Sequence, residues 1–253
     1  MLRSHNLSKE DFEDSLLCVA RAGAGTNNIP IEDATKNGIV VFNTPGANAN
    51  AVKELVICGM LLSSRGIIEG IEFAKSLELD NSEALNKAME AQKKTFAGNE
   101  LDGKTLGIIG LGSIGSMLAQ AAQTLGMKLI GYDPYISIEG AWRLSREVKK
   151  SETMEELLQK SDYVSLHVPL VEETKNLINK SNLKNFKKGA RLINLSRGGI
   201  VNTTDVIDEL ETGNLGRFVT DFPTPELIKR SAANNDVVLL PHLGASTKEA
   251  EVN

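Results

Sequence analysis

The sequence predicts an α/β protein built on a doubly wound parallel sheet. From residue 105 onward, six short apolar runs alternate with helical patterns along the chain. Such alternation is typical of βαβ units, whose strands pair in parallel. Most of these runs are apolar throughout, as expected of strands whose two faces are both covered by helices. The sequence therefore favours a sheet that lies between two helical layers.

We expect two domains, divided near the turn-rich segment GNELDG at residues 98–103. The first, residues 1–98, contains a long and mostly apolar helical pattern over residues 50–77, followed by a polar stretch rich in Lys and Glu. The second, residues 99–253, contains the six apolar runs. These runs predict strands over residues 105–110, 128–133, 162–169, 190–196, 217–222 and 236–241.

Helix boundaries between these strands are also visible in the sequence. Thr153, followed three residues later by Glu156, predicts a capping box that opens a helix over residues 154–160. Gly213 predicts the end of a helix over residues 204–212, because glycine readily adopts the conformation that terminates helices. The boundaries agree with the predicted strands.

Composition and charge exclude several classes of protein. The chain has 28 Lys and Arg residues against 33 Asp and Glu, a net charge of −5, so no basic face is available for nucleic acid. Its two cysteines, Cys18 and Cys58, lack the spacing of a disulfide scaffold or a zinc site and fit a reducing compartment. The longest apolar stretch, residues 55–62, is too short to cross a bilayer. We expect a cytoplasmic protein with no metal, membrane or nucleic-acid partner.

Gly110, Gly112 and Gly115 form a GxGxxG pattern between a predicted strand and a predicted helix that ends at Gly126. In this context the first glycine permits a tight turn, the second lets the backbone approach a pyrophosphate, and the third allows close packing of helix and strand. The helix N-terminus adds free N–H groups and a positive dipole. The pattern predicts a site for a dinucleotide.

Asp133 ends the next predicted strand, 18 residues beyond Gly115. A carboxylate at this place can accept hydrogen bonds from an adenosine ribose and would repel a 2′-phosphate, so NAD is favoured over NADP. The alternative is a glycine-rich turn that binds no ligand, with Asp133 as a surface residue before Pro134.

His242 follows a predicted strand at the carboxyl edge of the sheet, where doubly wound sheets bind their ligands. Arg197, Asp221 and Glu226 follow two other predicted strands at the same edge. Hydride transfer from an alcohol carbon needs a base for the hydroxyl proton, a carboxylate that orients this base, and a cation that binds the substrate. His242, Glu226 and Arg197 can fill these three roles. The alternative is a histidine satisfied within its loop and an arginine in an exposed ion pair.

Two other chemistries are disfavoured. Ser196 lies in LSRGG and not in a GxSxG pattern, so the signal for a hydrolase nucleophile is missing. No GxxxxGK[ST] pattern is present, which disfavours nucleotide hydrolysis.

Seven segments of the chain, in their order and spacing, resemble those of the D-isomer-specific 2-hydroxyacid dehydrogenases. They are most similar to the branch of that family that oxidises 3-phosphoglycerate to 3-phosphohydroxypyruvate, the first step of serine biosynthesis. The resemblance implies a Rossmann-type NAD-binding domain over residues 99–253 and an incomplete, flavodoxin-like substrate-binding domain within residues 1–98. The segments are RAGAGTNN (21–28), NTPGANANAVKEL (43–55), GKTLGIIGLGSIG (103–115), GYDP (131–134), HVPL (167–170), INLSRGGIV (193–201) and PHLGAST (241–247).

The resemblance also implies roles for individual residues and a homodimer or higher homo-oligomer. Arg197, Glu226 and His242 would form the catalytic triad, whereas His167 would belong to the cofactor side. The substrate would be bound by Arg3 and Ser4, the backbone of Ala22 and Gly23, Asn48 and Arg197. NAD would be held by Gly110, Gly112, Ser113, Ile114, Gly115, Asp133, His167, Val168, Pro169, Leu195, Ser196, Arg197, Asp221, His242, Gly244 and Ala245.

The segment TDFPTPEL departs from the family pattern, in which Asp-Val-Phe is followed by Glu-Pro. Counting from Asp221 keeps Glu226 at the catalytic position, whereas aligning on Phe222 puts Pro225 there. The chain also opens inside the expected substrate domain and stops before the helix that returns to it. We therefore expect it to be a piece of a longer polypeptide.

Three alternatives to the oxidation of 3-phosphoglycerate stay open. A D-2-hydroxyacid dehydrogenase that acts on glyoxylate, hydroxypyruvate or D-lactate belongs to the same enzyme class. An NAD-sensing scaffold, such as the C-terminal-binding corepressors, shares the fold without catalysis. NAD binding without turnover is the third, because an incomplete lobe does not close reliably over a substrate.

Overall fold

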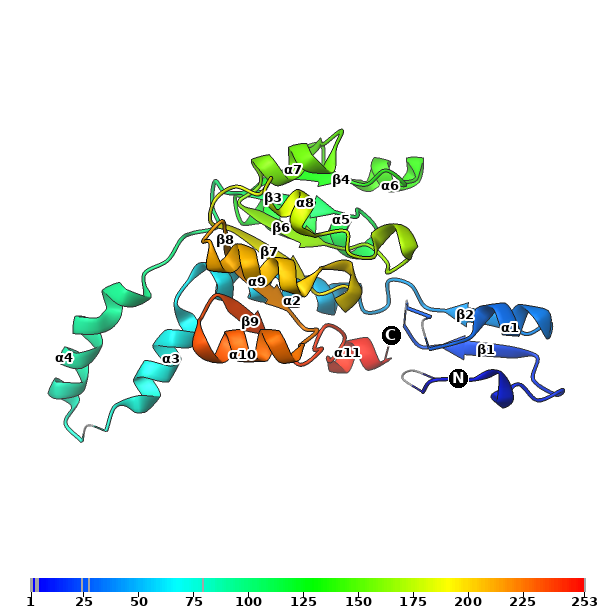
Figure 1. The fold of residues 1–253 in the computed structure, drawn as a ribbon, viewed down its shortest axis with the longest axis horizontal. Coiled ribbons are helices and arrows are strands. Elements are labelled where there is room, and N and C mark those ends of the chain that lie inside the picture. Colours follow the sequence, from blue (N-terminus) through cyan, green and yellow to red (C-terminus); the bar gives the residue numbers. More distant parts are fainter. Residues whose placement is uncertain (1, 3–4, 24, 27, 79, 253) are drawn as a thin grey trace.

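In the computed structural model, seven parallel strands form one sheet in the order β5-β4-β3-β6-β7-β8-β9 (Figure 1). The structure describes residues 2, 5–23, 25–26, 28–78 and 80–252. The chain builds outward from β3 to β5, then crosses to β6 and continues to β9. The strand order therefore reverses between β3 and β6, where such sheets bind ligands at their carboxyl edge. The strands are β3 (Thr105–Ile109), β4 (Lys128–Tyr132), β5 (Val148–Lys150), β6 (Tyr163–Leu166), β7 (Ala190–Asn194), β8 (Leu215–Thr220) and β9 (Val237–Leu239).

Helices cover both faces of this sheet, which confirms the predicted doubly wound α/β fold. One layer, formed by α2 and α5, buries Met60, Leu118 and Ile193 in a shared core. The other layer, α7 to α10, shares a core around Leu157 and Val206. The helices are α2 (Ala49–Ser64), α3 (Ile67–Ser76), α4 (Ser82–Gln92), α5 (Ser113–Thr124), α6 (Ile138–Arg143), α7 (Met154–Lys160), α8 (Lys180–Leu183), α9 (Thr203–Glu211), α10 (Pro225–Ala233) and α11 (Lys248–Val252), with 3-10 turns η1 (Lys9–Asp11), η2 (Lys93–Phe96), η3 (Glu172–Thr174) and η4 (Gly198–Ile200).

The N-terminal segment forms a small βαβ unit at one end of the molecule (Figure 1). β1 (Cys18–Arg21) pairs in parallel with β2 (Val40–Asn43), and α1 (Ile31–Lys36) connects them. Val19, Ala34 and Ile39 are buried between strands and helix. The carboxyl ends of β1 and β2 lead into the RAGAGTNN and NTPG segments, and α2 then carries the chain to the large sheet.

The structure has two helices where one long helix was expected over residues 50–77. The helical conformation is interrupted after α2, at Arg65 and Gly66. Arg65 has extended backbone angles, φ −123° and ψ 146°. A Cβ at Gly66 would lie 2.9 Å from the backbone of Phe96, so glycine lets the two segments cross closely. After the break, α3 and α4 project away from the sheet as a pair (Figure 1).

Two arginines from the amino ends of β7 and β8 hold the end of α2 against the sheet. Arg191 Nε donates to the carbonyl oxygen of Ser63 at 3.0 Å, and Arg217 Nη1 donates to that of Leu62 at 3.2 Å. These bonds satisfy carbonyl groups that a helix C-terminus leaves without intrahelical partners. α2 is therefore fixed at the edge opposite to the one where ligands are expected.

The predicted helix boundaries and strands agree with the structure in part. Thr153 accepts a hydrogen bond from Glu156 N as expected, but the Glu156 carboxylate accepts from Glu152 N, one residue before the N-cap, so the capping box is half formed. Gly213 has φ +72° just after α9, as predicted. The edge strand β5 was not predicted. Within the described residues, none of the helices has the length and hydropathy needed to span a bilayer.

Candidate active site

The glycine pattern forms a tight turn between β3 and α5, at the point where the strand order reverses. Gly110 has φ +91°, and a Cβ there would lie 2.6 Å from the carbonyl oxygen of His167. A Cβ at Gly115 would lie 2.1 Å from the carbonyl oxygen of Gly110. Both glycines are therefore required by the packing of the turn itself.

Gly112 differs from its two neighbours, because a Cβ there would meet no atom within 4 Å. Gly112 is the N-cap of α5 and offers no side chain to its free N–H groups. Open space in front of a helix N-terminus is what a pyrophosphate requires. The turn therefore fits a dinucleotide, and the glycine is explained by the ligand and not by the fold.

Asp133 follows β4 beside this turn. Its Oδ2 accepts a hydrogen bond from Leu111 N at 2.8 Å, and its Oδ1 accepts one from Tyr135 N at 3.0 Å. These bonds fix the carboxylate next to the glycine turn, and each oxygen retains a lone pair for a further donor. The position suits recognition of a ribose.

His167 lies in the loop after β6, which packs against Gly110. Its Nε2 is 2.9 Å from Ser165 Oγ, and burial lowers its pKa from 6.5 to about 4. Among the described residues, Nδ1 is buried without a hydrogen-bond partner. His167 is therefore neutral near pH 7 and unsuited to hold a proton. The next two residues, Val168 and Pro169, complete the loop beside the glycine turn.

The turn after β7 carries Leu195, Ser196 and Arg197. Ser196 Oγ donates to the carbonyl oxygen of Leu166, which ties this turn to the end of β6. Buried Asn194 accepts from Ser196 N and donates to the Arg197 carbonyl at 2.8 Å, so it braces the turn from both sides. Arg197 Nη1 donates to the carbonyl oxygen of Ser196 at 2.7 Å. Nothing in the sequence pattern indicated the bracing role of Asn194.

Asp221 directly follows β8, and His242 lies three residues after the end of β9. Asp221 is buried, with 1% of its surface exposed, and a Cβ at Gly244 would lie 3.6 Å from its Oδ2. Burial raises the pKa of Asp221, while the charges of His242 and Arg197 oppose that rise. The carboxyl group of Asp221 is thus within electrostatic range of the His242 imidazole and the Arg197 guanidinium. Ala245, predicted with Gly244, follows in the same segment and is half-buried.

His242 itself has an unusual backbone conformation. Its φ is +47°, a left-handed value that is uncommon for residues other than glycine. The turn is tight, since His242 N donates to the carbonyl oxygen of Leu240 at 3.1 Å. The imidazole is exposed at the carboxyl edge and meets the ring of Phe222, with centroids 4.9 Å apart.

Glu226 lies in the first turn of α10 and is exposed. Hydrogen bonds from its own N–H and from Thr224 lower its pKa, and Lys229 is the charged residue that adds to this effect. A carboxylate at this helical position can turn back to the free N–H groups. Among the described residues, Asp221 is the carboxyl group whose pKa the charge of His242 lowers.

The residues expected on the substrate side lie in the N-terminal unit. Ala22 N donates to the carbonyl oxygen of Leu2 at 2.8 Å, and Gly23 N donates to Thr44 Oγ1 at 2.7 Å. These N–H groups are thus engaged within the unit. Asn48 is the N-cap of α2, and its side chain makes no cap hydrogen bond. Arg3 and Ser4 lie outside the described residues.

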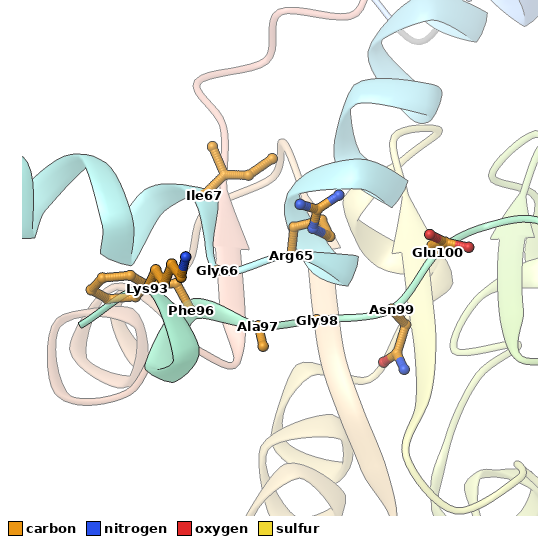
Figure 2. A pocket seen from close by; sticks show the side chains of 9 residues that line it. All are labelled: Arg65, Gly66, Ile67, Lys93, Phe96, Ala97, Gly98, Asn99 and Glu100. Carbon is orange, nitrogen blue, oxygen red and sulfur yellow. The ribbon is translucent and has the colours of Figure 1, made fainter. Parts of the chain in front are cut away.

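A cavity in the described part of the chain lies away from the carboxyl edge of the sheet. It has a volume of about 480 Å³ and lies where the segment after α2 crosses the segment before β3 (Figure 2). Arg65, Lys93 and Glu100 line it and are all exposed. A smaller cavity, of about 230 Å³, lies behind Phe222 and is lined by Asn194, Thr220 and Leu227 among others.

Comparisons with known proteins agree with this geometry. The model for the NAD-binding domain of the D-isomer specific 2-hydroxyacid dehydrogenases matches residues 67–244. The chain is 38% identical to the D-3-phosphoglycerate dehydrogenase of Bacillus subtilis, over all of this chain and 46% of that protein. It is 37% identical to the hydroxypyruvate reductase of Thermotoga maritima, over 94% of this chain and 73% of that protein.

The fold is similar to that of a solved NAD⁺-bound 3-phosphoglycerate dehydrogenase from Entamoeba histolytica. The TM-score is 0.78 at 29% identity, and the match covers all of this chain and 74% of the other. A glycine turn at the switch point of a seven-stranded parallel sheet defines a dinucleotide-binding domain. The chain belongs to the D-isomer specific 2-hydroxyacid dehydrogenases, which confirms the predicted family, and NAD, as predicted, is the cofactor of the matched domain. The chain spans about half the length of the curated 3-phosphoglycerate dehydrogenases that it matches, 46% in the case of Bacillus subtilis.

Proposed function

We propose that this chain is part of an enzyme that oxidises 3-phosphoglycerate to 3-phosphohydroxypyruvate with NAD. The observation that carries the proposal is that Arg197, Asp221 and His242 follow β7, β8 and β9 at the sheet edge that also carries the glycine turn. The choice of 3-phosphoglycerate as the substrate is supported by the relatives that are named D-3-phosphoglycerate dehydrogenase. Formation of this keto acid is the first step of serine biosynthesis.

Each group has a distinct task in this proposal. Bound NAD would supply the hydride acceptor. His242 accepts the proton of the C2 hydroxyl group, which is the proton transfer that oxidation of an alcohol carbon requires. Arg197 binds the substrate carboxylate through its planar guanidinium, whose donors match a carboxylate in pairs. The cradle formed by Gly110, Gly112 and the N-terminus of α5 fixes the pyrophosphate.

We propose Glu226 as the carboxylate that orients His242 in the working enzyme, with Asp221 on the cofactor side. Support for Glu226 comes from its position in the first turn of α10, directly after the strand that ends beside Asp221. Two matched variants separate the carboxylates, because Glu226→Gln and Asp221→Asn each remove one charge and keep the shape. We expect Glu226→Gln to shift the acid limb of the pH profile of kcat. An unchanged profile in that variant, with a shifted one in Asp221→Asn, would assign the orienting role to Asp221.

We also propose that residues 1–98 provide the substrate side and residues 99–253 the cofactor side. The RAGAGTNN and NTPG segments leave β1 and β2 at their carboxyl ends, which is where parallel strands present ligand-binding loops. Ala22, Gly23 and Asn48 lie on these segments or directly after them. Replacing Asn48 by Ala should raise the KM of the hydroxy acid and leave the Kd of NAD unchanged.

We also propose that the protein forms a homodimer. Ile67 and Ile71 lie one helical turn apart on α3 with 39% and 49% of their surfaces exposed, and Met89 on α4 is 36% exposed. These helices project from the body of the molecule (Figure 1). Exposed apolar side chains gathered on one feature are typical of an interface between protein chains. In sedimentation experiments we expect Ile71→Asp to dissociate the dimer and Val40→Asp, an equally exposed control on β2, to leave it intact.

A substrate panel tests the proposed reaction. NADH formation with 3-phosphoglycerate and D-lactate, and NADH consumption with glyoxylate and hydroxypyruvate, are compared by kcat/KM on the purified chain. We expect the largest value for the phosphorylated substrate. Hydroxypyruvate is the rival, because the Thermotoga maritima relative carries that activity in its name. NAD binding with no turnover of any substrate would refute the proposed activity and leave a nucleotide-binding protein.

A further inference from the structure

Phe222 contacts His242 and lies beside the turn that carries Arg197. Its ring meets the imidazole of His242 edge to face, with centroids 4.9 Å apart and planes inclined by 66°. A Cβ at Gly198 would lie 3.3 Å from the Phe222 Cβ and 3.5 Å from its Cγ. Gly198 is the residue after Arg197. One aromatic side chain therefore contacts both the imidazole and the turn that carries the guanidinium.

The imidazole of His242 has little else to hold it. Among the described residues it makes no hydrogen bond, and it is exposed at the sheet edge. Its backbone lies in the left-handed region, with φ +47°, and is constrained by the short turn from Leu240. Its charge acts on the buried Asp221, which follows β8, and so does the charge of Arg197. Charge attraction alone is not directional, so it leaves the ring free to rotate.

Phe222 is itself held in place. Its N–H donates to Thr220 Oγ1 at 3.2 Å, and the residue before it is the buried Asp221. The side chain forms part of the wall of the cavity of about 230 Å³, together with Pro223 and Thr224. A smaller side chain at 222 would enlarge this cavity toward His242 and leave the imidazole unsupported. The ring thus borders both this cavity and the histidine.

We propose that Phe222 is a positioning residue that holds the His242 imidazole in its reactive orientation against the Arg197 turn. The proposal rests on the proposed function, in which His242 accepts the substrate proton. Edge-to-face contacts between aromatic rings are directional, because the positive edge of one ring meets the negative face of the other. The contact therefore restricts the rotation of the imidazole, and its loss should lower the fraction of enzyme that is ready to accept a proton.

Three variants test this role. Phe222→Leu removes the aromatic ring and retains an apolar side chain, and Phe222→Tyr retains the ring. Phe186→Leu is the control, because Phe186 is a phenylalanine buried in the core beneath α7 to α10 and makes no ring contact with His242. Each variant is examined with and without NAD. The chain has three histidines, so the ring proton signal of His242 is assigned by its loss in His242→Asn.

The first readout is the chemical shift of the His242 ring proton in the protein without cofactor. We expect Phe222→Leu to move this signal, because the ring current of a neighbouring aromatic group is lost, and Phe222→Tyr and Phe186→Leu to leave it in place. The second readout is the division of the effect between kcat and KM. Phe222→Leu should lower kcat by about tenfold, the change that loss of one aromatic pair contact allows, with the Kd of NAD unchanged. Phe222→Tyr should restore kcat.

The outcomes separate this proposal from the one on which it rests. An unmoved His242 signal in Phe222→Leu, or equal losses of kcat in Phe222→Leu and Phe186→Leu, would overturn the positioning role alone. Full turnover in His242→Asn would overturn the proposed function and the positioning role together. A moved signal, a lower kcat and rescue by tyrosine would support both.

Discussion

Gly115 approaches Gly110 so closely that a Cβ at position 115 would lie 2.1 Å from the carbonyl oxygen of Gly110. Gly112, three residues earlier, would carry a Cβ with no atom within 4 Å. Glycine is therefore needed at position 115 because the protein packs closely there, whereas at position 112 it keeps space open for a ligand.

This difference predicts opposite effects for two alanine variants. Gly115→Ala should destabilise the protein by about 1–3 kcal/mol, because the new methyl group displaces backbone. Gly112→Ala should leave the thermal midpoint unchanged and weaken NAD binding by about tenfold or more, because the methyl group occupies the place of the pyrophosphate. Thermal denaturation and calorimetric titration with NAD measure the two effects. Unchanged NAD affinity in Gly112→Ala would contradict the assignment of the cradle.

Asp221 should lower the stability of the protein near neutral pH. Burial raises its pKa above the unfolded value, so the folded state favours the protonated carboxyl group and loses stability as the pH rises through this pKa. Asp221→Asn should therefore be more stable than the wild type at pH 7. The gain should vanish below about pH 3.8, the ordinary value for this carboxyl group. Urea denaturation at several pH values measures it, and a variant less stable than the wild type at pH 7 would show that the charge is stabilising.

The lowered pKa of His167 predicts that the free energy of unfolding decreases on acidification. Burial lowers its pKa from 6.5 to about 4, so the unfolded chain binds the proton first as the pH falls. The stability that the neutral ring provides is complete above pH 6.5 and declines between there and about pH 4, by about 1.4 kcal/mol for each pH unit within this window. In His167→Gln this part of the pH dependence should be absent. Parallel pH profiles of unfolding in the two proteins would contradict the burial of a neutral imidazole.

Arg197 should not be replaceable by lysine. The planar guanidinium can bind a carboxylate through two parallel bonds, whereas an ammonium group acts as a single point charge. We expect Arg197→Lys to raise the KM of the phosphorylated hydroxy acid and to lower kcat/KM by about tenfold or more. Arg230→Lys is the matched control, because Arg230 on α10 binds a carboxylate in the same way, that of Asp236, through Nε and Nη2. That variant should lose stability and keep its substrate KM.

Local signals in the sequence predict most of the sheet and the glycine cradle. A buried parallel strand appears as a continuous apolar run, and the GxGxxG spacing is imposed by contacts within a few residues, such as that between Gly110 and Gly115. The break between α2 and α3 was not predicted, because its cause is the backbone of Phe96, 30 residues away in the chain. β5 has three residues at the sheet edge and gives too short a pattern to detect.

For the candidate active site, the sequence predicts only a set of candidate residues at the carboxyl edge of the sheet. His242, Arg197 and Asp221 follow strands whose carboxyl ends must meet in a parallel sheet, so the sequence indicates that they are neighbours. Which carboxylate faces the imidazole depends on where α10 begins, and no local pattern determines the direction of Glu226. The contact of Phe222 with His242 joins residues in the loops after β8 and β9 and depends on the side-chain packing at the edge.

The proton-accepting role of His242 is tested most directly by His242→Asn, measured for NAD affinity and for NADH formation with 3-phosphoglycerate. Asparagine tolerates the left-handed backbone at this position, so the variant should fold. We expect kcat to fall by about 10²- to 10⁴-fold, the usual contribution of a general base, while the Kd of NAD stays the same. An unchanged kcat in this variant would contradict the account.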